Sequence, residues 1–408
     1  MPTGTLLEDA REIAGRIVSL RRAIHAEPEL GLETPRTRDK VRAELADLPL
    51  EWREGPSTTG AVAVLKGAAP GPCVLLRGDM DALPMHEETG LDFASAVPGR
   101  MHACGHDAHT AMLAGAARIL TARRETLAGE VRFMFQPGEE GFHGARFMLE
   151  DGLLGGAADG KADGSPLPDA AFALHVMPNA RHGVIGSRAG PLMAAADALQ
   201  ITVTGRGGHA SMPHDTRDPV PVACEIVGAI QTLVTRRFDA AEAVVVTITQ
   251  LDAGTAQNII PDRVVMKGTI RTLSPATRET VHAALARLVQ GIAAAHEMEA
   301  EVTIVPGFPP TINDERAVAL GERIARELGG SESFLRMAHP IMGAEDFSYV
   351  LQKVPGAMFF LGVAREGDDW SQCCGLHSSR MMVDETTLPH GAAFLAACAT
   401  RFLAQGWD

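Results

Sequence analysis

The chain has 408 residues, more than one hydrophobic core usually organises, so we expect two domains. Hydrophobic residues make up 46% and charged residues 22%, which is typical of a soluble globular protein. The net charge of -14 argues against nucleic acid or an anionic membrane as a partner, since both require a basic face. The N-terminal stretch is amphipathic and carries acids early, unlike a secretory signal. These features predict a cytoplasmic protein whose six cysteines are thiols.

The first half of the chain alternates helical and strand patterns. Short apolar runs bounded by Gly or Pro predict strands, and apolar residues at helical spacing predict helices. The predicted helices cover 6–24, 36–47 and 107–123, and the predicted strands cover 61–67, 72–80, 131–137 and 170–177. This alternation indicates an α/β fold with a mixed, mainly parallel sheet between helices. A Gly-, Ala- and Asp-rich stretch at 155–168 predicts an exposed loop.

The pattern changes at about residue 190. Strands and helices follow in the order β-α-β-β-α-β, which is the order of a ferredoxin-like α+β domain. The predicted strands are 197–205, 242–252, 263–273 and 300–307, with helices at 218–236 and 275–296. Further on, a strand at 355–363 and a helix at 386–404 continue the first pattern. We therefore expect a discontinuous domain of residues 1–189 and 308–408, with 190–307 inserted.

Ligand-type side chains stand at the ends of several predicted strands. Cys104 and His106 precede a helix, and thiolate and imidazole are good ligands for zinc-like ions. Strands also end in carboxylates or histidines, and parallel strands meet at one edge of a sheet. These residues are Asp79, Asp81, Glu139, Glu140, His175 and His377. The pattern predicts a metal site in which one member of the adjacent Glu pair binds metal and the other acts as general base.

Ordered motifs extend over nearly the whole chain: RRAIHAEPELG, RGDMDALP, MHACGHDAHT, FQPGEEG, ALHVMP, GRGGHASMPH, GTAQNIIPDRVVMKGTIRT, MGAEDF and LHSS. On these motifs the sequence resembles the M20 metallopeptidase family. Within it, the sequence is similar to the amidohydrolase branch of hippurate hydrolases, bacterial aminoacylases and plant auxin-conjugate hydrolases. The resemblance implies a zinc-peptidase-like catalytic domain and an inserted lid or dimerisation domain.

The resemblance implies a role for each site residue. The metal ligands would be Cys104, His106, Glu140, His175 and His377, with the Cys104 thiolate bridging two ions. Glu139 would be the general base, and Asp81 would orient a ligand or position this base. Asp79 stands where many members have a ligand histidine, and it receives no definite role. Asp107 and Glu345 are expected to accept hydrogen bonds from ligand imidazoles.

The inserted segment contributes three further residues by resemblance. His209 would stabilise the oxyanion, often in the active site of a partner subunit, and Asn258 would serve the same pocket. Arg271 would bind a substrate carboxylate through its planar guanidinium. His209 is thus expected both in catalysis and in substrate binding.

The predicted reaction is hydrolysis of the linear amide bond of N-acyl-L-amino acids by metal-bound hydroxide and the Glu139 base. Two divalent ions are expected, Mn²⁺ or Zn²⁺, with Co²⁺ or Ni²⁺ as alternatives. The expected partners are the small-molecule substrate and further copies of the chain, in a homodimer or higher homo-oligomer formed through the inserted domain.

Other functions remain open from the sequence. One is a neighbouring M20 activity, such as a dipeptidase or a deacetylase of a biosynthetic intermediate. Another is a thiol hydrolase with Cys104 as nucleophile and His106 or His175 as base, but it would leave Glu139, Glu140 and His377 without roles. A third is a non-catalytic binding protein on the same fold, which the intact ligand set argues against.

Overall fold

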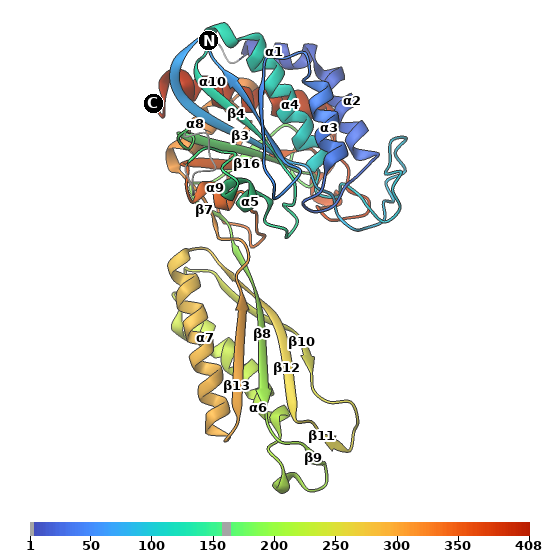
Figure 1. Ribbon diagram of the computed structural model, residues 1–408, viewed down its shortest axis with the longest axis vertical. Helices are drawn as coiled ribbons and strands as arrows, with labels where there is room; N and C mark the ends of the chain where they lie inside the picture. Colours follow the sequence, from blue (N-terminus) through green and yellow to red (C-terminus); the bar gives the residue numbers. More distant parts are fainter. Residues whose placement is uncertain (1–3, 157–164) are drawn as a thin grey trace. The chain divides into compact units, whose positions relative to one another are not determined.

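The computed structural model describes residues 4–156 and 165–408 (Figure 1). The chain forms two compact units. Unit 1 comprises Met1–Leu192, Ile312–His339 and Asp346–Asp408, and unit 2 comprises Met193–Thr311 and Pro340–Glu345. Most of the predicted loop at 155–168 lies outside the described residues. The catalytic role of the first domain and the lid or dimerisation role of the second stay predictions.

Unit 1 is built on an eight-stranded sheet in the order β1-β2-β4-β3-β5-β16-β6-β15. The central strands β4, β3, β5 and β16 run parallel, and β1 and β2 pair antiparallel with their neighbours. Strand β6 pairs antiparallel with β16 and parallel with β15. The prediction of a mixed, mainly parallel sheet is therefore confirmed. The strands are β1 (Glu51–Glu54), β2 (Ala61–Lys66), β3 (Ala69–Asp79), β4 (Ala128–Gln136), β5 (Ala170–Met177), β6 (Ile185–Ser187), β15 (Phe334–Arg336) and β16 (Gly356–Gly362).

Helices pack on this sheet. The predicted helix at 6–24 is two helices, because the backbone turns at Ile13. The helices of unit 1 are α1 (Gly4–Glu12), α2 (Ala14–His25), α3 (Pro35–Glu44), α4 (His106–Ala122), α5 (Gly144–Glu150), α8 (Glu315–Gly329), α9 (Ser348–Leu351) and α10 (Leu388–Gln405). No helix in the described parts of the chain is long and apolar enough to cross a lipid bilayer.

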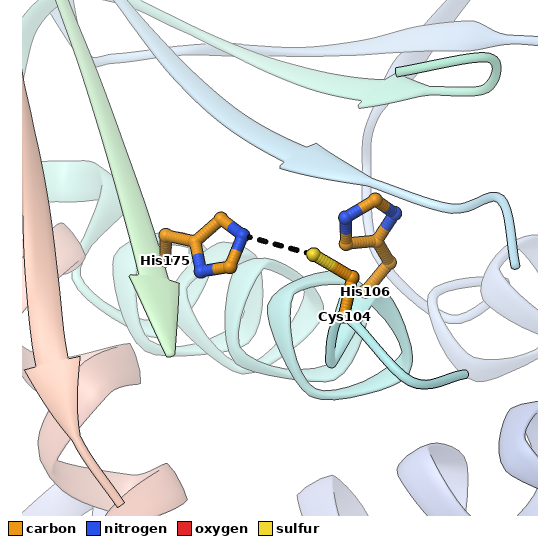
Figure 2. Close-up of side chains that lie close together, drawn as sticks. All are labelled: Cys104, His106 and His175. Atoms are coloured by element: carbon orange, nitrogen blue, oxygen red, sulfur yellow. Dashed lines mark hydrogen bonds between the residues drawn. The ribbon is translucent and has the colours of Figure 1, made fainter. Parts of the chain in front are cut away.

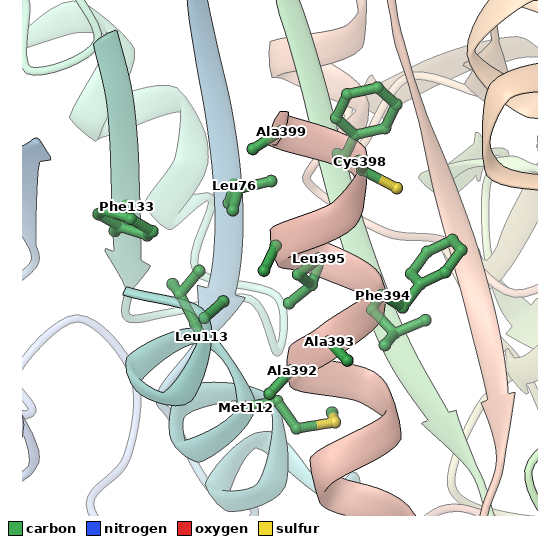
Figure 3. Close-up of a cluster of buried hydrophobic side chains, with 14 of the residues drawn as sticks. Leu76, Met112, Leu113, Phe133, Ala392, Ala393, Phe394, Leu395, Cys398 and Ala399 are labelled. Carbon is green, nitrogen blue, oxygen red and sulfur yellow. The ribbon is translucent and has the colours of Figure 1, made fainter. Parts of the chain in front are cut away.

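Helices α4 and α10 pack together in the core of unit 1 (Figure 3). The contact surface of α10 carries small residues, including Ala392 and Ala393, and these let the two helix backbones approach closely. Larger side chains fill the space toward the sheet. Phe394 is fully buried, and its ring meets Phe359 of β16 edge to face at 5.0 Å. This core fixes the start of α4 relative to the parallel strands.

Unit 2 has the predicted ferredoxin-like order. Its antiparallel sheet runs β10-β12-β8-β13, and helices α6 and α7 pack on it. Both helices begin with a capping side chain followed by Pro, in Asp218-Pro219 and Ser274-Pro275. The elements are β8 (Ala195–Thr204), α6 (Pro219–Arg237), β10 (Val244–Asp252), β12 (Arg263–Thr272), α7 (Pro275–Ala295) and β13 (Glu299–Val305).

Two short ribbons complete the described strands. One pairs β9 (Gly208–His209) with β11 (Ile259–Ile260), and the other pairs β7 (Gly190–Met193) with β14 (Thr311–Asn313). All four strands are at most four residues long, so they carry too few residues for a periodic pattern. These four strands were therefore not predicted from the sequence.

Replacing Phe394 by Ala tests the packing of α10. Alanine suits the helix, so the cost comes from the cavity left beside Phe359, and we expect a loss of about 3–5 kcal/mol in unfolding free energy. Urea unfolding followed by circular dichroism measures the loss. The control is Phe142→Ala, because Phe142 is 50% exposed; it should cost within about 0.5 kcal/mol. Equal losses in both variants would contradict this account of the core.

Candidate metal centre

The predicted ligand residues of unit 1 come together at the carboxyl ends of its central strands. Asp79 ends β3, and His175 lies near the end of β5. Cys104 and His106 stand where α4 begins, Glu139 and Glu140 follow β4, and His377 follows β16. Parallel strands present these ends at one edge of a sheet, which explains the convergence of residues that are far apart in the sequence.

Two groups of potential ligand atoms share the Cys104 thiol. In one, Cys104, His106 and His175 place their atoms within 4.8 Å of one another, and all three residues are buried. Figure 2 shows this group, in which Cys104 Sγ lies 3.4 Å from His175 Nε2. In the other, Cys104 groups with Glu140 and His377, and His377 Nε2 lies 3.2 Å from Glu140 Oε1. The shared sulfur is the arrangement that a bridging thiolate requires.

The imidazole nitrogens have the orientation that metal ligation needs. His175 Nδ1 donates to the carbonyl of Val176 at 2.6 Å, so Nε2 carries a lone pair and faces Cys104. His106 is fully buried, and neither of its ring nitrogens has a hydrogen-bond partner among the described residues. A buried polar atom without a partner is costly. A bound cation would satisfy it, so these residues fit a metal ion.

The charges at the site also favour a cation. Hydrogen bonds to Cys104 and Glu140 raise the pKa of His377 to about 10. Burial opposes a charge on His106, but the neighbouring Asp79 and Cys104 raise its pKa well above the usual value. Glu140 is also largely buried, and His377 and His106 outweigh that burial and lower its pKa. Positive charge is therefore stabilised here, as expected where divalent ions bind between anionic ligands.

Asp81 fixes the turn that carries the two adjacent glutamates. Its Oδ1 accepts the backbone N–H of Glu139 at 3.0 Å, and its Oδ2 accepts that of Glu140, also at 3.0 Å. His106 Nδ1 lies 3.5 Å from Asp81 Oδ1. Glu139 is 7% exposed, and its carboxylate groups with His106 and Glu140 within 4.8 Å. Asp81 thus determines where both glutamates point.

Asp79, which the sequence left without a role, is the centre of a buried ion-pair network. It lies 2.6 Å from Arg77 Nη1 and 2.6 Å from His109 Nδ1. His109 Nε2 accepts the backbone N–H of Val176 at 2.8 Å, next to the ligand candidate His175. Arg77 was not predicted as a site residue, and His109 was expected only to pack near the ligands or to support them, without a named partner. The available signal was their position, Arg77 two residues before Asp79 and His109 one helical turn after His106.

The expected role of Asp107 is wrong. Its Oδ2 accepts hydrogen bonds from Arg21 Nε at 2.9 Å and His25 Nδ1 at 2.8 Å, and within the described part of the chain it makes no hydrogen bond to a candidate ligand histidine. Burial opposes a charge on His25, but the charge of Asp107 outweighs it and raises the His25 pKa to about 9. Asp107 therefore joins the start of α4 to α2. The cause is the helical geometry, which turns adjacent side chains in different directions.

Two residues at the site have left-handed backbone. Gly105 has φ 83°, and a Cβ on it would lie 2.3 Å from Val176 Cγ2, so only glycine fits between Cys104 and His106. His377 has φ 63°, which is uncommon for a non-glycine residue, and its N–H donates to the carbonyl of Ala103 at 2.8 Å. This bond holds the loop after β16 against the segment that contains Cys104.

The geometry can be compared with known proteins. The profile of peptidase family M20/M25/M40 matches residues 75–401. The chain belongs to this family. A thermostable carboxypeptidase of Saccharolobus solfataricus is 38% identical over 97% of this chain and 98% of its own. An IAA-amino acid hydrolase of Arabidopsis thaliana, ILR1-like 2, is 37% identical over 98% and 88%.

A solved structure leads to the same family. The Bacillus subtilis protein YXEP, described as a dinuclear metal-binding peptidase of family M20, is 34% identical. It covers 97% of this chain and 99% of its own, with a TM-score of 0.82. The present M20 protein is therefore a metal-dependent hydrolase of the binuclear amidohydrolase type.

The burial of Cys104 argues against the alternative of a thiol hydrolase. A nucleophilic cysteine needs a lowered pKa, which comes from an exposed, electropositive position. Cys104 is 7% exposed, and burial raises the pKa of its thiol. The position of Cys104 therefore does not favour a nucleophilic thiolate.

The three predicted residues of the inserted segment all lie in unit 2. His209 on β9 pairs with Ile259 on β11, and the N–H of Ala210 donates to the carbonyl of Asn258 at 3.1 Å, so His209 and Asn258 are neighbours. Arg271 lies on β12, opposite Ala196 of β8. Among the described residues it has no carboxylate within ion-pair distance.

Replacing Asp81 by Asn tests the control of the glutamate turn. An amide NH₂ would face one of the two backbone N–H donors, so Glu139 should shift, and we expect amide hydrolysis to fall about 100-fold. Initial rates with the metal-loaded enzyme measure the effect. The control is Asp47→Asn, since Asp47 is 65% exposed and pairs with Arg118. A rate within threefold of wild type for the Asp81 variant would contradict the assignment.

Proposed function

We propose that this M20 enzyme hydrolyses the amide bond of N-acyl-L-amino acids. The observation that supports it is the pair of ligand groups sharing Cys104, with the Glu139 carboxylate beside them. Cys104, His106 and His175 would hold one divalent ion, and Cys104, Glu140 and His377 the other. Thiolate, imidazole and carboxylate together suit Mn²⁺ or Zn²⁺, and also Co²⁺ or Ni²⁺. The six thiols agree with a cytoplasmic location.

The proposed chemistry divides between the ions and the protein. When bound, the two ions supply Lewis-acid activation of the amide carbonyl and of the attacking water. Glu139, held by Asp81, is placed to accept a proton from that water and to return it to the leaving amine nitrogen. Asp81 is a positioning residue, because both of its oxygens bind backbone N–H groups.

His209 has the tautomer that an oxyanion donor needs. Its Nδ1 accepts the backbone N–H of Ser211 at 3.1 Å, so in the neutral ring the proton sits on Nε2. The exposed Nε2–H is then free to donate to a developing negative charge. Asn258, beside it, would serve the same part of the substrate. Arg271 would bind the carboxylate of the amino acid.

The geometry of unit 2 supports a role for a second copy of the chain. On β12, Arg263 pairs with Thr204 and Arg271 pairs with Ala196, eight residues away, which is about 25 Å along the strand. His209 and Asn258 lie beyond the Arg263 end. One small substrate cannot span that distance, so His209 and Arg271 of the same copy cannot both serve it. We propose a homodimer in which each active site receives His209 from the partner.

The edge strand β10 suits such an association. It is nine residues long, and its apolar residues Val245 and Leu251 are 37% and 43% exposed. A long edge strand with exposed apolar side chains favours pairing with another chain. The dimer would therefore form through unit 2.

Replacing Glu139 by Gln tests whether this residue is the general base and not a metal ligand. Glutamine keeps the shape of the side chain but cannot accept the proton, so turnover should fall by a factor of at least about 100. Metal content by plasma mass spectrometry should stay near that of wild type. The matched comparison is Glu140→Gln, in which metal content should fall too. A parallel loss of metal in Glu139→Gln would show that this residue is a ligand.

Mixed dimers test the origin of His209. The Glu139→Gln and His209→Ala variants should each be inactive. If each active site takes His209 from the partner, a mixed dimer contains one intact site. An equal mixture after subunit exchange should then recover about a quarter of the wild-type rate. Rates of N-acyl amino acid hydrolysis before and after exchange measure this, and no recovery would place His209 in the site of its own subunit.

The similarity to the Saccharolobus carboxypeptidase favours one further activity. A carboxypeptidase cleaves the amide bond next to a free carboxylate, as an aminoacylase does. A panel of N-acyl amino acids and dipeptides, tested on the metal-loaded enzyme, distinguishes the two. Faster turnover of dipeptides than of every N-acyl amino acid would replace the proposed substrate class by peptides.

A further inference from the structure

Unit 1 contains an apolar hollow beside a residue of the candidate metal centre. The hollow has a volume of about 350 Å³. Its walls are mostly apolar and come from the four neighbouring strands β5, β16, β6 and β15 and from the loops next to them. The residues that form these walls and carry the argument are Met177, Val184, Leu335, Met337, Phe360 and Trp370. Pockets of about this size, with mainly apolar walls, are typical of small-molecule sites.

The sheet register connects this hollow to the metal centre. His175 of β5 pairs with Phe360 of β16, Phe360 pairs with Gly186 of β6, and Gly186 pairs with Leu335 of β15. Directly paired residues point to the same face of a sheet, so these four form one row. The rings of His175 and Phe360 are 6.1 Å apart. The hollow is therefore one aromatic ring away from a proposed ligand.

The hollow exists in part because one residue of this row, Gly186, has no side chain to fill it. The atoms nearest to a Cβ built on it would be the Leu335 carbonyl oxygen at 3.7 Å, Met337 Cγ at 3.9 Å and Leu335 Cβ at 4.0 Å, all ordinary contact distances. Around the space, Leu335 is 59% exposed and Trp370 is 45% exposed. Large apolar side chains that stay in water around a hollow indicate a surface that becomes covered by an apolar group.

We propose that this hollow binds the acyl group of the substrate and selects apolar, aromatic-sized acyl groups. The assignment rests on the proposed amidohydrolase function. It is made entirely of unit 1 residues, whereas the carboxylate candidate Arg271 belongs to unit 2. In an N-acyl amino acid, the acyl group and the carboxylate lie on opposite sides of the amide bond. The acyl group is therefore the part of the substrate that this hollow would receive.

The size of the hollow sets the size of the group. A cavity of about 150 Å³ holds a benzene molecule. The hollow of about 350 Å³ has room for a phenylalkyl or bicyclic group. The side chains of Arg181 and Glu332 also line it, so polar groups are available at its boundary. An acetyl group would leave most of the apolar wall uncovered.

The test is a pair of variants that fill the hollow. Gly186→Leu places a side chain inside it, and Leu335→Trp enlarges an already exposed side chain at its wall, which keeps the test valid if the first variant folds poorly. The control is Ala319→Leu, which fills a different hollow of about 280 Å³ beside α8. Rates are compared for N-acetyl- and N-phenylacetyl-L-alanine, and then for N-acetyl-L-alanine and N-acetyl-L-phenylalanine.

We expect kcat/KM for the phenylacetyl substrate to fall at least about tenfold in both filling variants. The acetyl substrates should change less than threefold, and Ala319→Leu should leave all rates unchanged. Phenylacetate binding to the metal-free protein, measured by calorimetry, should weaken in parallel. An equal loss for all substrates, no loss, or a loss that follows the amino acid side chain would overturn the acyl assignment. If wild type hydrolyses none of these amides, the proposed function itself fails, and the acyl assignment fails with it.

Discussion

A single buried carboxylate holds the turn after β4, which carries the two adjacent glutamates, in place. Asp81 is 1% exposed, and both of its oxygens accept backbone N–H groups of the segment that follows β4. A buried charge must keep its partners, because losing them costs several kcal/mol. The end of β3 and the turn after β4 therefore cannot move apart while the unit stays folded. Two glutamates adjacent in the chain, which would otherwise repel each other in a flexible loop, are given fixed and different directions.

A second group of buried charged side chains surrounds Asp79, two residues before Asp81, at the end of β3. Arg77 lies between Asp79 and Asp346, and His109 connects Asp79 to the backbone beside His175. Each of these side chains is buried and lies within ion-pair or hydrogen-bond distance of another member of the network. This network holds the backbone next to the candidate ligands in position, although its own members are not proposed as ligands. Asp79, which received no definite role from the sequence, is part of this support.

Much of the fold could be predicted because the long helices and strands carry a clear periodic pattern of apolar residues. The strand at 170–177 has the predicted bounds, and the parallel sheet brings Cys104 and His175 together as its topology requires. Two kinds of feature could not be predicted. Strands of three residues, such as β6 and β15, are too short for a periodic signal. The partners of Asp107 and His109 depend on which way each side chain leaves α4, and spacing alone does not determine that.

The exposure of His377 makes the two proposed metal positions unequal. Cys104, His106 and His175 are buried, whereas the His377 side chain is 54% exposed and sits on a loop with left-handed backbone. Local opening of that loop would free an ion held by Glu140 and His377 without disturbing the core, whereas an ion held by His106 and His175 would leave only if α4 separated from β5. The two ions would then have different lifetimes on the protein. Mild chelation would then leave a long-lived species with one ion per subunit. The metal content of a purified sample would depend on whether it had been exposed to a chelator.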